Sequence, residues 1–373
     1  MIIAGEISGD MHGAALIREL KNLDREISIC GIGGDKMKDA GMHLIYHLKK
    51  MAFLGFVEVL RHLPFIKKVQ KDLLKVIKEK NIKDVVLIDY PGFNLNFAKK
   101  LKTLNVKIIY YISPQLWAWG MWRLKKIQKL IARMLVVFPF EEEIYKKAGI
   151  DVVFVGHPLL EKISGHSFLS RSELDSKFDL SPGKDILLIL PGSRENEVKK
   201  IFPESIKAAE KIANEFDLQI VSACSPNIDE KLLYDLAGNE NFKVVKDFTY
   251  DLMKHAKFGI IKSGTSTLES GIFELPMVIV YKTSMITYLI GKKLIMVNNI
   301  GMANIILGEK VVPELIQSEV NENSIYNESK KILSDIGIYN SIKEKLKNIK
   351  DKLGSAGASK RAAEAIYALM NEA

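Results

Sequence analysis

Short stretches of consecutive apolar residues alternate with helix-forming segments along most of this chain, and this alternation constrains its fold more than any other feature. Strands with one solvent-exposed face alternate apolar and polar residues; these do not, so we expect helices on both faces. The expected strands are residues 27–32, 84–88, 106–112, 134–138, 152–155, 186–190, 218–222, 243–245, 258–261 and 277–281. The pattern predicts an α/β fold built from doubly wound parallel sheets.

The length of the chain predicts two domains. It has 373 residues, 47% of them hydrophobic, which exceeds the size at which a single core stops growing. The polar segment 161–184, which contains Ser181-Pro-Gly183, breaks the alternation and is the best candidate linker. We therefore expect Rossmann-like domains over 1–160 and 185–352, and a helix over 353–373 that crosses back to the first domain.

The charge of the chain indicates an anionic partner. A formal charge of +9 and a pI near 9.1 suit a nucleic acid, an anionic lipid or a phosphorylated substrate, and charge alone does not choose among them. No apolar run reaches the roughly 18 residues of a spanning helix, and no secretory signal is recognisable. The only cysteines, Cys30 and Cys224, form no CxxC pattern, which fits a reducing compartment. We expect a cytoplasmic protein.

The first loop with chemical potential lies in the second domain and runs from a strand into a helix. In Leu190-Pro-Gly-Ser-Arg194, Gly192 and Ser193 offer backbone donors and a hydroxyl group, and Arg194 offers a guanidinium group. Backbone N–H groups at a helix start bind phosphate, and arginine binds it in bidentate fashion. The alternative is a plain strand-to-helix turn with a capping serine.

A second loop of the same domain repeats this design. It offers hydroxyl groups and backbone donors at a helix start from Ser263, Gly264, Thr265, Ser266 and Thr267. Glu269 follows in the first turn, where its carboxylate either accepts the hydroxyls of a ribose or only complements the helix dipole. Two phosphate-type loops in one domain favour a nucleotide or a nucleotide sugar as ligand.

The first domain carries acidic residues where ligands usually bind. Glycines at every fourth position surround Glu6, Asp10 and His12 in Ala4-Gly-Glu-Ile-Ser-Gly-Asp-Met-His-Gly13, which suits acid–base chemistry, although a tight turn with a capping Asp10 explains the same residues. Asp89 ends a buried strand, and that position is more often functional than structural in this architecture.

All tryptophans of the chain, Trp117, Trp119 and Trp122, lie in one loop after an expected strand. They form either a ligand wall or an aromatic cluster between two layers, and the cations that follow them favour an anionic ligand. We expect no metal site, because the seven histidines are scattered without HxxxH or HExxH spacing and no Asp-x-Asp occurs.

The stretch 51–80 has more apolar residues than one buried helix face requires. Phe56, Leu60, Phe65 and Leu74 supplement a helical apolar stripe, and basic residues outnumber acidic ones around them. This combination predicts an interfacial membrane contact. The alternative is a core helix with a solvated basic face.

Several segments together resemble the lipid-A-disaccharide synthase family. They occur in the family's order along nearly the whole chain: Ala4-Gly-Glu-Ile-Ser-Gly-Asp10, Asp89-Tyr-Pro-Gly-Phe-Asn94, Ser113-Pro-Gln-Leu-Trp-Ala-Trp119, Phe138-Pro-Phe-Glu141, Val155-Gly-His-Pro158, Leu190-Pro-Gly-Ser-Arg194, Ser263-Gly-Thr-Ser-Thr-Leu-Glu269 and Pro313-Glu-Leu-Ile-Gln317. The family usually carries a longer strand before Ala4, so the first strand is expected to be short, which raises the question of a start codon further upstream.

The resemblance implies a GT-B glycosyltransferase with two Rossmann-like domains and an interdomain cleft. It implies an inverting transfer, without metal or cofactor, from UDP-2,3-diacylglucosamine to 2,3-diacylglucosamine 1-phosphate (lipid X), which gives a β-1,6-linked disaccharide and UDP. The protein would be cytoplasmic and peripheral on the inner membrane of a Gram-negative bacterium, with no nucleic-acid partner. A homodimer is compatible with it.

The resemblance also assigns roles to residues. Arg194 and the turn 263–267 would stabilise the departing diphosphate, and Glu269 would hold the ribose. Asp89 would be the general base for the acceptor 6-hydroxyl, with Asp10 and Glu6 as substitutes. The other expected substrate contacts are Gly192, Ser193, Asn304, Trp117 and Trp119. The competing hypotheses are a UDP-sugar 2-epimerase of the same fold and a non-catalytic module that binds lipid or nucleic acid.

Overall fold

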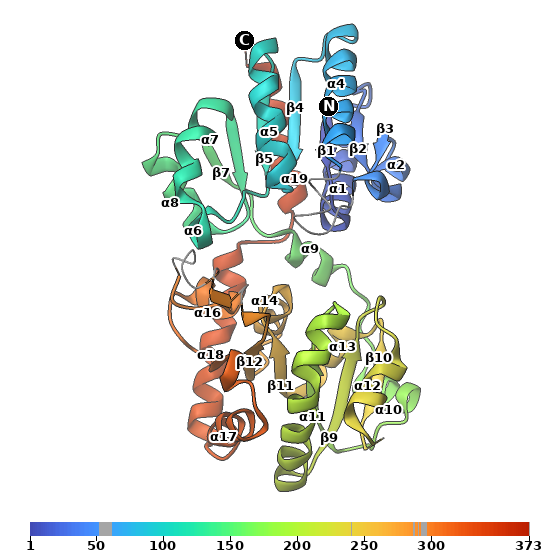
Figure 1. Cartoon of the computed structure of the whole chain (residues 1–373), viewed down its shortest axis with the longest axis vertical. Coiled ribbons are helices and arrows are strands. Elements are labelled where there is room, and N and C mark those ends of the chain that lie inside the picture. Colours follow the sequence, from blue (N-terminus) through green and yellow to red (C-terminus); the bar gives the residue numbers. More distant parts are fainter. Residues whose placement is uncertain (52–61, 240, 286–287, 290, 292–296, 373) are drawn as a thin grey trace. The chain divides into compact units, whose positions relative to one another are not determined.

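The chain folds into two compact units that each contain one parallel sheet (Figure 1). The structure, a computed structural model, describes residues 1–51, 62–239, 241–285, 288–289, 291 and 297–372. Unit 1 comprises Met1–Ser164 with Leu353–Ala373, and unit 2 comprises Gly165–Lys352. Parallel sheets with strand orders that reverse once confirm the predicted doubly wound α/β fold class.

The sheet of unit 1 is seven-stranded over the described residues. Its spatial order is β3 (His43–His47), β2 (Cys30–Gly33), β1 (Ile2–Ala4), β4 (Asp84–Ile88), β5 (Lys107–Tyr111), β6 (Arg133–Val136) and β7 (Val152–Phe154). The order reverses between β1 and β4. In open α/β sheets, ligands bind outside the carboxyl ends of the strands at such a switch point.

Helices cover both faces of this sheet. They are α1 (Ile7–Leu23), α2 (Asp35–Asp39), α4 (Leu63–Glu79), α5 (Pro91–Leu101), α6 (Leu116–Trp119), α7 (Leu124–Leu130), α8 (Pro139–Lys147), α9 (Pro158–Ser164) and α19 (Ala358–Asn371), with short 3-10 turns at Leu48–Lys50, Lys102–Leu104 and Met121–Arg123. The C-terminal helix α19 packs against α1 and contacts β5. On the other face, α4, α5 and α7 share one apolar core with the strands.

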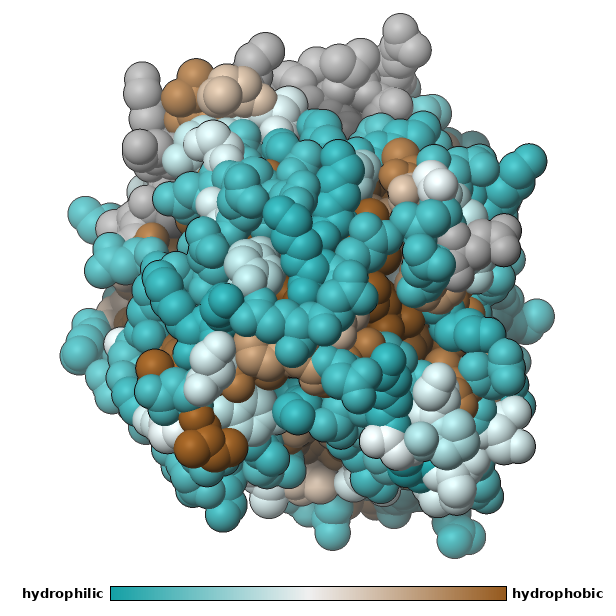
Figure 2. All heavy atoms as spheres, turned by 90° about the horizontal axis from the view of Figure 1, so that it is seen from below, coloured by the Kyte–Doolittle hydropathy of each residue, from teal (hydrophilic) through white to brown (hydrophobic). Residues whose placement is uncertain are grey.

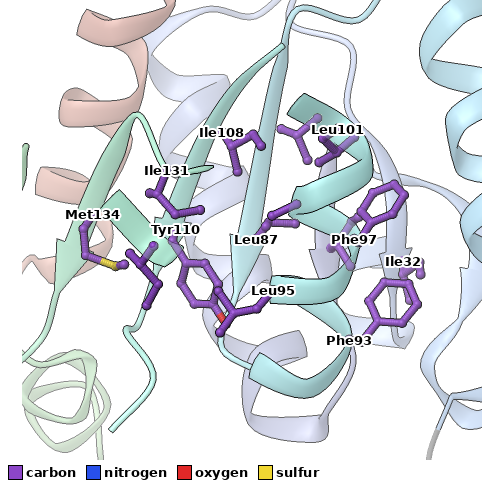
Figure 3. Close-up of a cluster of buried hydrophobic side chains, with 14 of the residues drawn as sticks. Ile32, Leu87, Phe93, Leu95, Phe97, Leu101, Ile108, Tyr110, Ile131 and Met134 are labelled. Carbon is purple, nitrogen blue, oxygen red and sulfur yellow. The ribbon is translucent and has the colours of Figure 1, made fainter. Parts of the chain in front are cut away.

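That core depends on the alternating faces of the central strands. Leu87 of β4 and Tyr110 of β5 point toward α5, which contributes Phe93 and Phe97 (Figure 3). Phe93 and Phe97 stack with ring centroids 5.8 Å apart. Phe97 is fully buried, so its replacement by alanine would cost about 3–5 kcal/mol in free energy of unfolding. The packing fixes the carboxyl edge of the sheet where the expected site residues begin.

Unit 2 repeats the topology. Its sheet is six-stranded over the described residues, in the order β10 (Lys243–Lys246), β9 (Leu218–Cys224), β8 (Asp185–Leu190), β11 (Ala256–Lys262), β12 (Met277–Tyr281) and β13 (Glu314–Ile316), so its switch point lies between β8 and β11. Its helices are α10 (Arg171–Phe178), α11 (Glu195–Phe216), α12 (Glu230–Ala237), α13 (Thr249–His255), α14 (Thr265–Ile272), α16 (Met302–Leu307), α17 (Glu322–Leu333) and α18 (Ile336–Leu353), with a 3-10 turn at Gln317–Glu319.

Every strand expected from the alternation is present. The structure adds the short first strand β1, which the resemblance implied, and β3 and β13, which both lie at sheet edges and which the sequence analysis missed. The expected linker 161–184 is partly helical, since it contains the end of α9 and all of α10.

The expected membrane stretch is only partly described. Phe56 and Leu60 lie outside the described residues. Phe65 and Leu74 of α4 are half-buried and pack against the core of unit 1, which differs from the exposed position expected for them. Part of each side chain therefore belongs to the core, which favours the alternative of a core helix for these two residues.

The surface of the protein also bears on whether it contacts a membrane. Among the described residues, no helix combines the length and the hydropathy needed to cross a bilayer. The face shown in Figure 2 is mostly hydrophilic, and its apolar residues form small separate patches. This face therefore offers no broad apolar surface.

Candidate active site

The carboxyl ends of β1 and β4 lie side by side at the switch point of unit 1. Glu6 follows β1, and Asp89 follows β4 directly, so both carboxylates leave the same edge of the sheet. A Cβ atom at Gly5 would lie 2.2 Å from the Tyr90 ring. Glycine at position 5 therefore allows the two strand ends to approach this closely.

The backbone at Asp89 is held in an uncommon conformation. Asp89 and Tyr90 have φ angles of 44° and 46°, in the left-handed region that costs a non-glycine residue roughly 1–3 kcal/mol. The Asn94 amide donates to the main-chain oxygen of Asp89 at 2.7 Å, and the Tyr110 hydroxyl donates to the same oxygen at 2.5 Å. These two contacts compensate the strained turn and fix the direction in which Asp89 leaves the strand.

Asp89 has the electrostatic properties of a general base. Burial, and then the negative charge of Glu6, raise its pKa to about 6, while a main-chain hydrogen bond from Tyr90 lowers it. Glu6 itself is exposed and makes no capping hydrogen bond to α1. A base whose pKa lies near neutral pH combines the deprotonated form with an appreciable affinity for the proton. Asp89 is therefore a better candidate for the general base than Glu6.

Asp10 has a structural role, which differs from its expected role as a substitute base. Its buried carboxylate accepts hydrogen bonds from three main-chain N–H groups at the start of α2: Gly34 at 2.6 Å, Met37 at 3.1 Å and Lys36 at 3.2 Å. These donors occupy both carboxylate oxygens. Asp10 thus caps α2 from its position within α1, whereas the alternative considered from the sequence was a local turn capped by Asp10.

The aromatic turn after β5 is tied to a buried carboxyl group to which the sequence analysis gave no role. Glu141 of α8 is 1% exposed. It accepts hydrogen bonds from Ser113 Oγ at 2.6 Å and from Trp117 Nε1 at 3.2 Å. Burial raises the pKa of Glu141 to about 7, although these hydrogen bonds lower it. It is followed in the sequence by Glu142, which is half-buried, and Glu143, which is exposed, and a run of three glutamates does not show which of them is buried.

The three tryptophans have different environments. Trp117 packs edge-to-face on Phe140, with centroids 5.3 Å apart, so it belongs in part to an aromatic cluster. Trp122 is 75% exposed, with the Arg123 guanidinium 4.9 Å from its ring centroid. Trp119 lies in α6, and its side chain is outside what the structure describes. Trp117 is half-buried, so its packing supports the aromatic-cluster interpretation and its role as a ligand wall stays a prediction.

Burial keeps two histidines of unit 1, His12 and His157, in the neutral form. Burial, and then the charge of Lys162, lower the pKa of His12 to about 4, and burial with repulsion from His12 lowers that of His157 to about 3. His157 Nδ1 accepts a hydrogen bond from the Leu159 N–H group at 3.1 Å. His157 therefore presents its other ring nitrogen as a donor at neutral pH.

In unit 2, the two phosphate-type loops line one cavity of about 430 Å³. The cavity lies at the carboxyl ends of β8 and β11, which are neighbours at the switch point. The expected residues among its lining are Gly192, Ser193, Arg194, Gly264, Thr265, Ser266 and Glu269. The Glu269 carboxylate accepts a hydrogen bond from the Tyr250 hydroxyl at 2.8 Å, which orients it at the cavity wall.

Two hydroxyl residues of the second loop shape the turn instead of lining the cavity. Thr267 is fully buried, and its Oγ1 donates to the Gly264 carbonyl at 2.8 Å and accepts from the Met302 N–H at 2.9 Å. Ser263 donates to the Ile300 carbonyl at 2.8 Å. These contacts correct the expectation that both meet the ligand.

Asn304 is also structural, which differs from its expected role as a substrate contact. It is fully buried. Its Nδ2 donates to Val312 O at 2.9 Å and Glu314 Oε1 at 2.8 Å. Its Oδ1 accepts from the main-chain N–H groups of Val311 and Val312. All four hydrogen-bonding positions are thus occupied, and none is available to a ligand.

The cavity contains two charged residues that the sequence analysis missed. Lys262 and Glu197 line it, and their Nζ and Oε1 atoms lie 3.0 Å apart. The same Glu197 oxygen lies 3.7 Å from the Arg194 guanidinium. Lys262 lies at the carboxyl end of a buried strand, which is the same kind of position that made Asp89 a candidate site residue. Two cations and helix-start N–H groups suit an anion such as a diphosphate.

Among the described residues, no group of three or more His, Cys, Asp or Glu side chains is placed to hold a metal ion.

Comparison with known sequences identifies relatives along the whole chain. A family model described as lipid-A-disaccharide synthetase matches residues 1–368. The lipid-A-disaccharide synthase of Geobacter sulfurreducens is 40% identical over 375 residues, which cover 100% of this chain and 97% of that protein. The Coxiella burnetii enzyme of the same name is 36% identical over 371 residues, with coverage of 99% and 98%.

Solved structures share the fold at low sequence identity. A Staphylococcus aureus MnaA–UDP complex aligns with a TM-score of 0.68 at 15% identity and covers 100% of this chain and 96% of that one. The UDP-GlcNAc 2-epimerase of Neisseria meningitidis bound to UDP-GlcNAc gives 0.64 at 13% identity, covering 96% and 97%. The calicheamicin glycosyltransferase CalG4 gives 0.62 at 15% identity, covering 100% and 97%. These likenesses establish the fold.

Proposed function

The chain belongs to the lipid-A-disaccharide synthetase family, and from that premise we propose how its two units share the reaction. It is a glycosyltransferase of lipid A biosynthesis. We propose that it joins UDP-2,3-diacylglucosamine to 2,3-diacylglucosamine 1-phosphate and releases UDP. The observation that carries this proposal is the cavity of unit 2, in which both phosphate-type loops meet.

Unit 2 binds the nucleotide in this proposal. Arg194 and the main-chain N–H groups at the start of α14 neutralise the diphosphate, and Glu269 accepts hydrogen bonds from the ribose. Negative charge grows on the diphosphate as the sugar leaves, so preorganised cations and dipoles stabilise the transition state more than the ground state. The bond between the anomeric carbon and the diphosphate oxygen breaks, and UDP leaves with the electron pair.

Unit 1 binds the acceptor and supplies the base. The oxygen of the acceptor 6-hydroxyl attacks the anomeric carbon from the face opposite the diphosphate, which inverts its configuration. The hydroxyl proton passes to the Asp89 carboxylate. The raised pKa of Asp89 supports this role, because a base with a pKa near the working pH is efficient.

We also propose that unit 1 contacts the cytoplasmic surface of the inner membrane. Three apolar side chains support this surface: Ile7 is 71% exposed at the start of α1, Leu63 is 40% exposed at the start of α4, and Trp122 is 75% exposed after β5. Ile7 and Trp122 come after the carboxyl ends of β1 and β5, and Leu63 begins the helix that precedes β4. The net charge of +9 favours anionic headgroups. This contact would bring the site to acyl chains that stay in the bilayer.

Calorimetric titration with UDP tests the division of roles. Arg194→Ala should weaken UDP binding by about 10–100-fold, because it removes a charge-assisted contact, whereas Asp89→Asn should bind UDP like the wild type. Lys199→Ala is the matched control, since Lys199 lies exposed on α11, the helix that Arg194 precedes, and pairs with Glu195. Wild-type protein that fails to bind UDP would contradict the proposed function. Unchanged binding by Arg194→Ala would remove that residue alone.

The epimerase alternative is tested in the same preparation. An epimerase of this fold would convert UDP-N-acetylglucosamine to its 2-epimer without any acceptor. The proposed transferase should leave that compound unchanged and should need the acylated acceptor. Epimer formation would favour the alternative.

A further inference from the structure

An ion pair between Lys262 and Glu197 lies inside the unit 2 cavity and is not explained by either phosphate-type loop. The two side chains are 17% and 18% exposed, and their charged atoms are 3.0 Å apart. Lys262 comes from the end of β11, whereas Glu197 comes from the first turn of α11. The pair therefore joins the two elements that carry the loops on either side of the switch point.

We propose that Lys262 is a binding residue for the diphosphate and that Glu197 is the residue that positions its ammonium group. This inference rests on the proposed function, because it assumes a nucleotide diphosphate as the ligand. It adds a second cation to Arg194.

The position of the Lys262 ammonium supports a direct contact with phosphate. A Cβ atom at Gly264 would lie 3.8 Å from Nζ, so the ammonium lies beside the turn at the start of α14. The free N–H groups at a helix start and a nearby cation attract the same anion. An ammonium group has three donors. One can remain on Glu197 while the others reach phosphate oxygens.

Glu197 is placed to orient cations. Its Oε1 contacts Lys262 and lies 3.7 Å from Arg194, and its Oε2 is buried without a hydrogen-bond partner among the described residues. A buried carboxylate oxygen without a partner is costly in free energy, and an ion pair that served stability alone would be expected to satisfy it. The Glu197 carboxylate instead holds two mutually repelling cations, Lys262 and Arg194, in one cavity before the anion binds.

The competing explanation is that the pair only ties α11 to β11. Both explanations predict some loss of stability when Lys262 is changed, so a stability measurement cannot separate them. A comparison of two ligands, one with the diphosphate and one without it, can. A phosphate contact affects UDP and leaves uridine binding unchanged, because uridine lacks the diphosphate, whereas a distorted cavity weakens both.

Calorimetry of Lys262→Met with UDP and with uridine provides the test. We expect UDP affinity to fall about 10–100-fold and uridine affinity to stay within about twofold of the wild type. Lys257→Met is the matched control, because Lys257 lies on the same strand and pairs with Asp185 at 2.8 Å, outside the cavity lining. It should leave both affinities unchanged. Equal losses for UDP and uridine in Lys262→Met would overturn the inference.

A second variant separates binding from the neutralisation of Glu197. In Lys262→Met/Glu197→Gln no carboxylate is left unpaired, so any remaining loss of UDP affinity reports the missing cation. We expect UDP affinity at least about fivefold below the wild type. Affinity equal to the wild type would mean that Lys262 only neutralises Glu197. Wild-type protein that binds uridine and UDP equally would instead contradict the diphosphate site itself, and with it the proposed function.

Discussion

The side-chain amide of Asn94 donates a hydrogen bond of 2.7 Å to the main-chain oxygen of Asp89. The same Nδ2 atom lies 3.2 Å from the Ile88 carbonyl oxygen. Asn94 is fully buried, and its Oδ1 has no hydrogen-bond partner among the described residues, so its role is confined to the amide donors. The first helical turn after β4 thereby fixes the left-handed backbone of the expected base.

Replacing Asn94 with alanine should lower kcat by about 10–100-fold with little change in UDP affinity. The strained turn would relax, and a base displaced by about 1 Å loses a rate factor of that size. Asn96→Ala is the matched control, because Asn96 lies exposed two residues further along α5. If Asn94→Ala keeps the wild-type rate while remaining folded, the turn does not need this amide for catalysis.

Asp89→Asn should reduce the rate by roughly two to four orders of magnitude. Only the deprotonated carboxylate accepts a proton, and its pKa is raised to about 6, so wild-type activity should rise with pH through about 6 and then level off. The rate–pH profile of the variant should lack this ascending limb. A variant that retains both the limb and an ordinary rate would place the base elsewhere, with Glu6 as the next candidate.

Glu141→Gln should change how stability depends on pH. The folded-state pKa of Glu141 is raised from 4.5 to about 7, so its stabilising contribution is present below about 4.5 and is lost as pH rises through about 7. Glutamine mimics the protonated form at every pH. Relative to the wild type, the variant should therefore gain on the order of 3 kcal/mol in free energy of unfolding between pH 4.5 and 8.

Tryptophan fluorescence during denaturation is the measurement for Glu141, because every tryptophan lies between residues 117 and 122 and Trp117 donates a hydrogen bond to this carboxyl group. Glu142→Gln serves as the control on the same helix. A stability difference between Glu141→Gln and the wild type that does not change with pH would show that Glu141 titrates normally.

The proposed membrane surface predicts that serine at Ile7, Leu63 and Trp122 releases the protein from anionic vesicles without unfolding it. Phe65→Ser/Leu74→Ser should unfold unit 1 more easily instead, because those side chains pack against its core. Ile336→Ser/Ile338→Ser, on exposed residues of unit 2, should leave vesicle binding unchanged. Vesicle sedimentation provides the measurement, and triple-variant protein that still sediments would exclude this surface.

Regular patterns made most of the fold predictable. Buried central strands such as β4 and β8 are continuous apolar runs, because helices cover both their faces. The edge strands β3 and β13 were missed for the opposite reason: β3 begins and ends with histidine, and β13 has three residues. A strand with one neighbour needs less apolar surface, so its sequence carries a weaker signal.

The candidate site was predictable where it depends on local sequence. Gly192 to Arg194 and Gly264 to Ser266 are turns at strand ends, and they line one cavity, while their contact with a diphosphate stays a prediction. Contacts between residues far apart in the chain could not be predicted from the sequence. Asp10 caps a helix 24 residues away, and Glu197 meets Lys262 65 residues away, because the sheet order brings them together.

Product analysis by mass spectrometry tests whether the protein transfers a glycosyl group between two acylated sugars. Purified protein incubated with UDP-2,3-diacylglucosamine and 2,3-diacylglucosamine 1-phosphate should form the disaccharide 1-phosphate and UDP in equal amounts. Neither product should form when one substrate is omitted. UDP release without disaccharide, conversion of the donor to an epimer, or no reaction with both substrates present would contradict the proposed glycosyl transfer.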